Sequence, residues 1–250
     1  MFTCKQLKAS AHETDILRGV DLHIPPGQVH VIMGPNGSGK STLSSCMMGD
    51  RNYQVTADVC QYQGQDLLSM SMDERSLAGI FLAYQNPVAI SGVNNMVFLK
   101  AMMNKHREAQ QLPPMDVYDV MTLIKQAAAR VGLDESFLMR DLNDDFSGGE
   151  RKRNEILQMI LLQPKLCVLD EIDSGLDVDA LKMIAQTVND MRSPDRSFVI
   201  VTHYQRMLDL IEPCAIHVMK DGVVQCSGGS ELADKIEAEG FSWLHEGQSV

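Results

Sequence analysis

Short apolar runs alternate with helix-like segments along most of this chain. Residues 28–34 (QVHVIMG) form a β-branched run that ends in glycine, and a helix-like segment follows over residues 40–48. Residues 165–170 (KLCVLD) and 197–203 (SFVIVTH) are further apolar runs of the kind that fills a buried parallel sheet. The alternation predicts an α/β fold in which helices flank a largely parallel sheet.

Other segments carry a different pattern. Residues 20–24 and 54–64 alternate apolar and polar positions, which predicts a small antiparallel layer near the N-terminus. Residues 215–228 predict a hairpin that turns at an Asp-Gly pair, and residues 231–240 have the spacing of one more helix.

Between residues 87 and 145 the pattern becomes helical. Residues 93–111 and 116–133 have helical spacing, with two prolines between them, and no good strand signal is present. Since the α/β pattern resumes afterwards, we interpret this segment as a helical subdomain inserted into a single domain. The expected organisation is one domain over 1–250, with a catalytic core at 1–86 and 146–230, a helical subdomain at 87–145, and a C-terminal helix and tail at 231–250.

Composition narrows the class of protein. The chain has 250 residues, 44% of them hydrophobic, which predicts a globular protein with a real core. A formal net charge of −11 excludes nucleic acid as an expected partner, because an acidic surface repels phosphates. No run approaches the roughly 20 apolar residues of a membrane span, and residues 1–10 lack a signal peptide's apolar stretch. The six cysteines lack metal-ligand spacing, so we expect buried thiols in a cytoplasmic chain without membrane insertion.

Residues 34–42 (GPNGSGKST), here called the phosphate loop, fit the pattern G-x-x-x-x-G-K-[ST] between a predicted strand and a predicted helix. The glycines let successive N–H groups face a β-phosphate, and the helix N-terminus adds its positive end. Lys40 can reach the β and γ phosphates of ATP, and the Ser41 hydroxyl is suited to Mg²⁺. The predicted nucleotide-binding residues are Gly34, Pro35, Asn36, Gly37, Ser38, Gly39, Lys40, Ser41 and Thr42.

Two carboxylates, Asp170 and Glu171, end the apolar run over residues 165–170. After a phosphate loop, a carboxylate at a strand tip is suited to hold Mg²⁺, so we predict Asp170 and Ser41 as metal ligands. Glu171 is predicted to polarise the water that attacks the γ-phosphate.

Two more polar residues complete the predicted catalytic set. His203 ends a later apolar run (VTHYQ) and is predicted to contact the γ-phosphate. Gln85 (AYQNP) precedes the helical segment, and its amide oxygen is predicted to bind Mg²⁺ or the attacking water. With Lys40 and Glu171, these residues are the predicted catalytic groups.

A second glycine stretch opens residues 145–159 (DFSGGERKRNEILQM). Ser147 is suited to cap a helix, with Glu150 at its third position as a capping box. The ordered series of phosphate loop, glutamine, Ser-Gly-Gly-Glu, Asp-Glu, SGLD at residues 174–177 and histidine resembles the ABC-type ATPase cassette. The resemblance extends over residues 1–228.

This resemblance implies a P-loop NTPase with a RecA-like parallel-sheet core, a small antiparallel β layer and an inserted helical subdomain. It also implies Mg²⁺-dependent hydrolysis of ATP. In the family, the Ser-Gly-Gly signature caps the γ-phosphate that a second cassette holds. Ser147, Gly148 and Gly149 would therefore complete the site of a partner molecule in a transient, ATP-dependent, head-to-tail homodimer.

The residues of these motifs are similar to those of the SufC family of ABC ATPases. The strings FSGGERKRNEILQM, LDEIDSGLDVDALK and VTHYQRML carry this resemblance. It implies an ATPase subunit of a SufBCD-type iron–sulfur cluster assembly complex, with SufB- and SufD-like scaffold proteins as partners, in the cytoplasm or, after removal of a targeting peptide, in the plastid stroma. The implied scaffold contact covers residues 86–105, with an apolar face of Met96, Val97, Phe98, Leu99, Met102 and Met103. The alternative for each of these side chains is a place in the core of the helical subdomain.

Two other functions compete with this one. The same ATPase chemistry could serve a membrane transporter. The residues of the motifs are what favours iron–sulfur assembly over that alternative. A nucleotide-gated interaction module with negligible turnover would not need a carboxylate at Glu171.

Two sequence features depart from the family pattern or extend it. Between Thr3 and Ile24 there is no Phe, Tyr or Trp on which adenine could stack. Lys152 follows the signature closely, and we expect it to pair with Glu171 or Asp173 and hold the resting monomer inactive.

Overall fold

A six-stranded sheet forms the centre of the molecule. The computed structural model describes residues 1–244, and this sheet has the strand order β13-β12-β3-β11-β10-β7. Every neighbouring pair is parallel except β12 with β13. The strands are β3 (Val29–Met33), β7 (Ile80–Ala83), β10 (Leu166–Asp170), β11 (Ser197–Val201), β12 (Ala215–Lys220) and β13 (Val223–Gly228).

The apolar runs of the sequence account for most of this sheet. Strands β3, β10 and β11 are buried at every position, as the parallel-strand pattern predicts. The predicted hairpin is β12 with β13, and its turn residues Asp221 and Gly222 both have positive φ, as a type I′ turn requires. Strand β7 was not expected, because four apolar residues are too few for periodicity to distinguish a strand from a helix.

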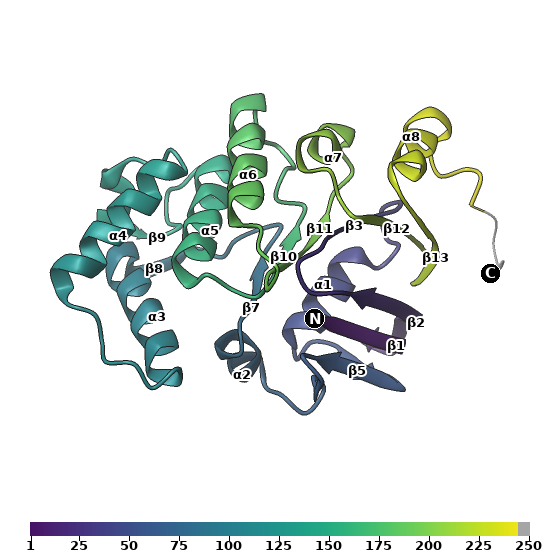
Figure 1. Ribbon diagram of the computed structural model, residues 1–250, viewed down its shortest axis with the longest axis horizontal. Coiled ribbons are helices and arrows are strands. Elements are labelled where there is room, and N and C mark those ends of the chain that lie inside the picture. The colour runs from purple at the N-terminus through teal and green to yellow at the C-terminus, as the bar shows by residue number, and fades with distance from the viewer. Residues whose placement is uncertain (245–250) are drawn as a thin grey trace.

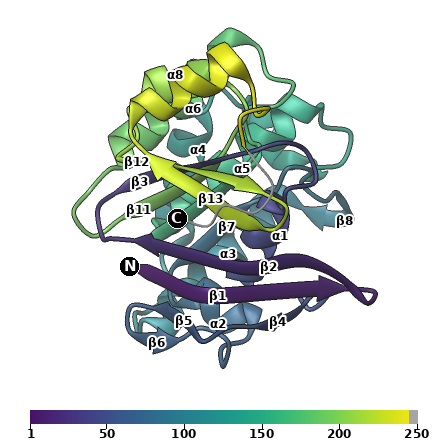
Figure 2. The ribbon, with the colours of Figure 1, turned by 90° about the vertical axis from the view of Figure 1, so that its right-hand side faces the viewer.

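An antiparallel sheet lies along one side of this core, where β1 and β2 run as a long pair (Figure 2). Its order is β2-β1-β5-β6, and β4 also pairs with β1. The predicted antiparallel layer is thus present but larger, because bulges in the β1–β2 register break the alternation that would have revealed β1. The strands are β1 (Phe2–Ala11), β2 (Thr14–Ile24), β4 (Gln54–Thr56), β5 (Val59–Tyr62) and β6 (Gln65–Asp66).

Two short helices join the sheets. Helix α1 (Lys40–Met48) buries Leu43 and Met47 in a core shared by both sheets. Helix α2 (Met72–Leu77) places Arg75 at the end of α1, where its guanidinium donates to the carbonyls of Cys46 and Met47. This contact satisfies carbonyls that the helix end leaves without partners.

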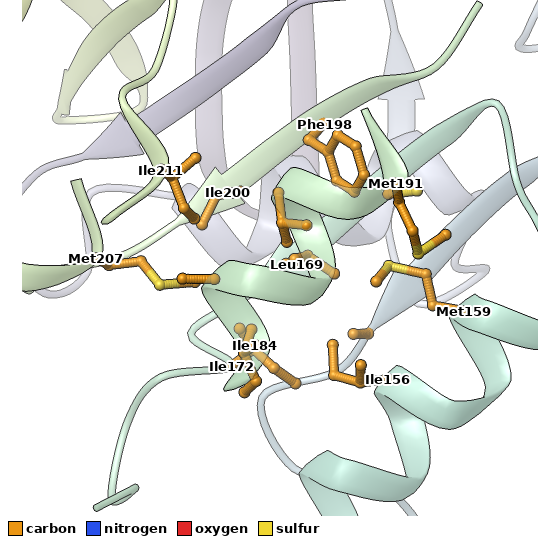
Figure 3. Packing of buried hydrophobic residues seen from close by; sticks show 14 of the residues in the cluster. Ile156, Met159, Leu169, Ile172, Ile184, Met191, Phe198, Ile200, Met207 and Ile211 are labelled. Atoms are coloured by element: carbon orange, nitrogen blue, oxygen red, sulfur yellow. The ribbon is translucent and has the colours of Figure 1, made fainter. Parts of the chain in front are cut away.

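Four helices cover the opposite face of the central sheet (Figure 1). Figure 3 shows Met159 and Ile184 packing with Leu169 and Phe198 of the sheet. Each such fully buried side chain contributes roughly 1.5–3 kcal/mol through the hydrophobic effect. The helices are α5 (Gly148–Leu162), α6 (Val178–Met191), α7 (Gln205–Ile211) and α8 (Ser230–Glu239).

The region between residues 87 and 145 is largely helical and lies at one end of the molecule (Figure 1). It contains α3 (Asn95–Ala109), α4 (Val117–Arg130) and the 3-10 helix η1 (Glu135–Met139). The expectation that it holds no strand is wrong, because β8 (Ile90–Asn94) pairs with β9 (Asp141–Leu142). Strand β9 has only two residues, and β8 (ISGVN) is interrupted by serine and glycine, so neither contains an apolar run that would reveal it. Only the fold brings them together.

The apolar face expected over residues 96–103 is only partly exposed. Leu99 and Met103 are buried in the core, and Met96, Phe98 and Met102 are partly buried against it. Val97 is well exposed, at 63%. The helical period of α3 turns part of this face toward α4 and α5, so the expectation is wrong for Leu99 and Met103.

Three expectations from composition and tail sequence have different outcomes. Four cysteines are buried, but Cys214 is exposed and Cys226 is partly exposed, so the expectation is wrong for these two. Across residues 1–244, none of the helices has the length and apolarity to span a membrane. The expected C-terminal helix is α8, whereas residues 245–250 of the expected tail lie outside the described residues.

Candidate active site

The phosphate loop leaves the end of β3 and closes onto the first turn of α1. Gly34, Gly37 and Gly39 have φ values of 149°, 79° and 100°, which glycine adopts without strain. A side chain at Gly34 would also collide with the main-chain carbonyl of Met219. The amides that open α1 have no intrahelical acceptor, so the loop and helix together present N–H donors to an anion.

Lys40 folds back over this loop. Its Nζ donates to the carbonyl oxygens of Gly34 at 2.9 Å and Pro35 at 3.0 Å. Burial lowers the pKa of Lys40, while the nearby Glu171 and Asp170 oppose that shift. The loop therefore already positions the ammonium group before any phosphate arrives.

Ser41 and Asp170 lie side by side although α1 and β10 are far apart in the sequence. Ser41 Oγ donates to Asp170 Oδ1 at 3.2 Å. Burial raises the pKa of Asp170 to about 6, with Ser41 opposing the shift and Glu171 adding to it. A hydroxyl and a carboxylate are the hard oxygen ligands that Mg²⁺ prefers, so the donor set fits this ion.

Gln85 and His203 converge on Glu171. Gln85 Nε2 donates to one carboxylate oxygen at 2.5 Å, and His203 Nε2 lies 3.0 Å from the other. Glu171 itself has φ 46°, a left-handed conformation that a non-glycine residue adopts only where the surroundings impose it. The structure thus brings three predicted catalytic residues together from the ends of β7, β10 and β11.

One cavity of about 340 Å³ lies between the phosphate loop, Gln85 and Glu171, whereas Asp170 and His203 are not among its lining residues. Gly34 and Pro35 are not part of its lining and instead hold Lys40. The Ser38 hydroxyl is buried without a hydrogen-bond partner in the described structure. The lining residues are Ile16, Asn36, Gly37, Gly39, Lys40, Ser41, Thr42, Gln85 and Glu171.

The second glycine stretch, residues 147–149, does not line this cavity. Ser147 Oγ accepts from Glu150 N at 3.3 Å, and the Glu150 carboxylate accepts from Ser147 N at 2.7 Å, so the predicted capping box is present. Ser147 and Gly148 are exposed. Neither Gly148 nor Gly149 has positive φ, and a Cβ at Gly148 would meet nothing within 4 Å. Within residues 1–244, neither backbone conformation nor space explains glycine at position 148.

Lys152 makes contacts that differ from those expected. Its Nζ donates to the main-chain oxygen of Glu171 at 3.0 Å, and to the oxygens of Ser174 at 2.5 and 3.1 Å. The described residues contain no ion pair between Lys152 and a carboxylate. Lys152 therefore holds the main chain of the turn after β10 rather than the acid of Glu171.

Two buried acids lie near the site: Asp173 was expected only as an alternative partner of Lys152, and Glu155 had no predicted role. Asp173 accepts a hydrogen bond from the Thr202 hydroxyl, and burial raises its pKa. Glu155 is buried on α5, and burial raises its pKa to about 7. Its position directly before Ile156 and Leu157 was the one available signal, since an acid on the apolar side of a helix needs a partner.

Comparisons with known proteins agree with this geometry. A family model described as "ABC transporter" matches residues 17–174. The chain is 47% identical over 248 residues to the "Probable ATP-dependent transporter SufC" of Escherichia coli (strain K12), covering 99% of this chain and all of the relative. It is 49% identical to "Probable ATP-dependent transporter slr0075" of Synechocystis, covering 98% of this chain and 96% of the relative.

Among solved structures, the fold is similar to a dimer described as a post-hydrolysis state of the ATP-binding cassette MJ0796 bound to ADP and Pi. The TM-score is 0.75 at 21% identity, covering 92% of this chain and 98% of the other.

Proposed function

The chain belongs to the ABC transporter family and hydrolyses ATP, and from this premise we propose that it is the ATPase subunit of a SufBCD-type iron–sulfur cluster assembly complex. The observation that carries the proposal is the likeness to the Escherichia coli protein named SufC, which extends over both chains almost completely. The proposed partners are SufB- and SufD-like scaffold proteins, which hydrolysis would rearrange. The proposed location is the cytoplasm, or the plastid stroma if a targeting peptide has been removed.

The proposed chemistry starts from the contacts of the cavity. Lys40 exchanges its two carbonyl partners for oxygens of the β and γ phosphates. Ser41 and Asp170 would hold Mg²⁺, with Gln85 as a further candidate ligand, and the ion would offset charge on the phosphates. Glu171 accepts a proton as water attacks the γ-phosphorus, and the bond to the bridging oxygen breaks to release ADP. Gln85 and His203 orient the carboxylate and the water.

Gly148 supports a shared site. A glycine that neither φ nor space requires within its own chain is consistent with close approach by another molecule. Gly148 and Gly149 present main-chain N–H groups at the α5 terminus, and the γ-phosphate on a second copy would bind to them beside the Ser147 side chain. The ATP-bound form is accordingly proposed to be a transient head-to-tail homodimer.

The proposed scaffold contact is the segment over residues 86–94, here called the docking loop, with its neighbours. Val88 is 72% exposed, and Ile90, Val97 and Met139 are exposed around it. Hydrogen bonds and strand pairing hold these residues in one area, because Asn94 accepts from Val97 N and donates to the Met139 carbonyl. An exposed group of apolar side chains of this kind is typical of a protein–protein contact.

One observation favours a second candidate, the ATPase subunit of a membrane transporter. The family model is described as "ABC transporter" and the relatives' names contain "ATP-dependent transporter". The two functions differ in the partner rather than in the reaction.

A purification from native lysate separates them. Tagged Glu171→Gln protein is captured with MgATP and without detergent, and the recovered proteins are identified by mass spectrometry. SufB- and SufD-like proteins would support the proposal, whereas a polytopic permease alone would transfer the function to the second candidate. Val88→Asp should abolish the recovery, and Tyr118→Asp is the matched control, since Tyr118 is 77% exposed on α4 away from the docking loop.

A further inference from the structure

A group of three buried asparagines lies between the docking loop and the signature helix α5. Asn95, Asn143 and Asn154, here called the asparagine triad, are 0%, 2% and 0% exposed. They come from the start of α3, the turn after β9 and the second turn of α5. A buried amide costs free energy unless it is hydrogen-bonded, so the pairing of these groups decides what they do.

The triad is fully connected. Asn95 Nδ2 donates to Asn154 Oδ1 at 3.1 Å, and Asn154 Nδ2 donates back to Asn95 Oδ1 at 3.4 Å. Asn154 Nδ2 also donates to Asn143 Oδ1 at 2.9 Å, and Asn143 Nδ2 donates to the carbonyl of Val88 at 2.9 Å. Asn143 has φ 58°, a left-handed conformation that asparagine tolerates better than most residues.

These bonds tie the segment after β7 to α5 at two places. Val88 is held through Asn143, and Asn95 is held directly by Asn154. The α5 residue in both cases, Asn154, lies within two turns of Gly148, which begins the helix.

Polar pairing of this kind has a consequence that apolar packing lacks. Apolar contacts have no preferred direction, whereas a connected amide network has one arrangement in which all its groups are paired. A shift of the docking loop relative to α5 would leave buried amides unpaired, which is unfavourable. The loop and the signature helix therefore move as one piece.

We propose that the asparagine triad is a set of positioning residues that couples the docking loop to the signature helix. A protein bound at Val88 thereby sets the position of the α5 N-terminus, which completes the site of the second copy. This rests on the proposed function for the identity of the bound protein, but the coupling itself is a property of this chain alone.

The first test needs no partner. Hydrogen exchange is compared in the wild type, Asn143→Ala and Asn104→Ala. Asn104→Ala is the matched control, because Asn104 Oδ1 accepts from Met115 N, in the link between α3 and α4. Asn143→Ala should raise exchange about tenfold in the docking loop and in the first two turns of α5, as expected for a lost buried pairing. Faster exchange in the docking loop with α5 unchanged would overturn the proposal.

The second test uses the scaffold proteins recovered with the wild type. Turnover is measured without and with them, and their affinity is measured separately. Asn143→Ala should reduce the stimulation about tenfold while basal turnover and affinity stay within about twofold, because coupling free energies are typically 1–3 kcal/mol. A parallel fall in basal turnover and thermal stability would indicate a merely structural role and would overturn the proposal. If the wild type shows no stimulation, the proposed function fails, and the exchange experiment still decides the coupling.

Discussion

Around the phosphate loop, Lys40, Ser41, Gln85 and Glu171 meet in one cavity, whereas Ser147 and Gly148 lie at the surface with the serine engaged in its own capping box. The glycines differ in the same way. Gly34, Gly37 and Gly39 have positive φ, so the fold of this chain explains them, but nothing described within the chain explains Gly148. The difference is the one expected if the monomer builds one half of the proposed site, the phosphate-loop half, and association supplies the other, the signature half.

Removing the Lys40 ammonium group from the phosphate-loop half of the proposed site should have the largest effect on turnover. In Lys40→Met the ammonium that faces the phosphates is lost, and turnover should fall about 10²–10³-fold, the usual loss when one transition-state donor is removed. The fold should survive, because Lys40 has only carbonyl partners and burial disfavours its charge. Phosphate release and thermal unfolding measure the two effects, and unchanged turnover would contradict the assignment of Lys40.

The signature half of the proposed site should respond differently to the addition of a single methyl group. Gly148→Ala should leave stability unchanged or raise it by up to about 1 kcal/mol, since alanine favours a helix and the site has space for a Cβ. Turnover should nevertheless fall, about 10-fold or more, because the methyl group obstructs the partner's phosphate. Gly37→Ala is the matched control: it has equal space but φ 79°, so it should lose about 1 kcal/mol of stability as well.

Mixing the two inactive variants tests association directly. A dimer of Lys40→Met with Gly148→Ala contains one site with both an intact phosphate loop and an intact signature. Turnover should therefore partly recover on mixing, and a mixture as inactive as its components would contradict the shared site.

At low pH, the region around the phosphate loop should lose stability before the region around the α5 N-terminus. Burial lowers the pKa of His30 on β3 and of His217 on β12 to about 4, and the two rings bond each other at 2.8 Å. In the unfolded chain these histidines bind protons near pH 6.5, whereas in the folded chain they bind them only near pH 4. Their contribution to the free energy of unfolding is therefore fully present above pH 6.5 and is lost as the pH falls from 6.5 to 4. We expect a slope on the order of 1 kcal/mol per pH unit in denaturant unfolding.

The location of that effect can be measured too. Hydrogen exchange at pH 5 should rise in β3, which leads into the phosphate loop, and in β12 and β13, but not in α5. His217→Gln should reduce the slope, and equal loosening of α5 would contradict the separation of the two halves.

The smallest effect concerns the nucleotide base. Ile16 is the one apolar side chain among the described lining residues, and a surface without hydrogen-bonding groups discriminates weakly between bases. ATP and GTP should bind with dissociation constants within about tenfold of each other. Ile16→Tyr should tighten both by stacking, while tripolyphosphate binding stays unchanged because the phosphate loop is intact. A large preference of the wild type for ATP would contradict this prediction.

Long, regular patterns in the sequence were sufficient for the parallel core and the hairpin, because buried strands and an Asp-Gly turn have strong local signatures. Strands β1, β7, β8 and β9 were missed, because bulges interrupt β1, β7 and β9 are short, and β8 (ISGVN) contains no apolar run. The apolar spacing of α3 was correct, but spacing alone does not say which side of the helix meets solvent. Leu99 and Met103 were therefore expected at a surface and lie in the core.

By itself, the sequence determined the phosphate loop, the acids that follow β10 and the capping box of α5, because each depends on residue types at fixed spacing along the chain. Only the tertiary structure decided which groups meet. The tertiary structure brings Gln85 and His203 to the carboxylate of Glu171. It brings Lys152 to the main-chain oxygen of Glu171 rather than to a carboxylate. It also joined Asn95, Asn143 and Asn154, since hydrogen bonds between residues distant in the sequence depend on packing that no local pattern encodes.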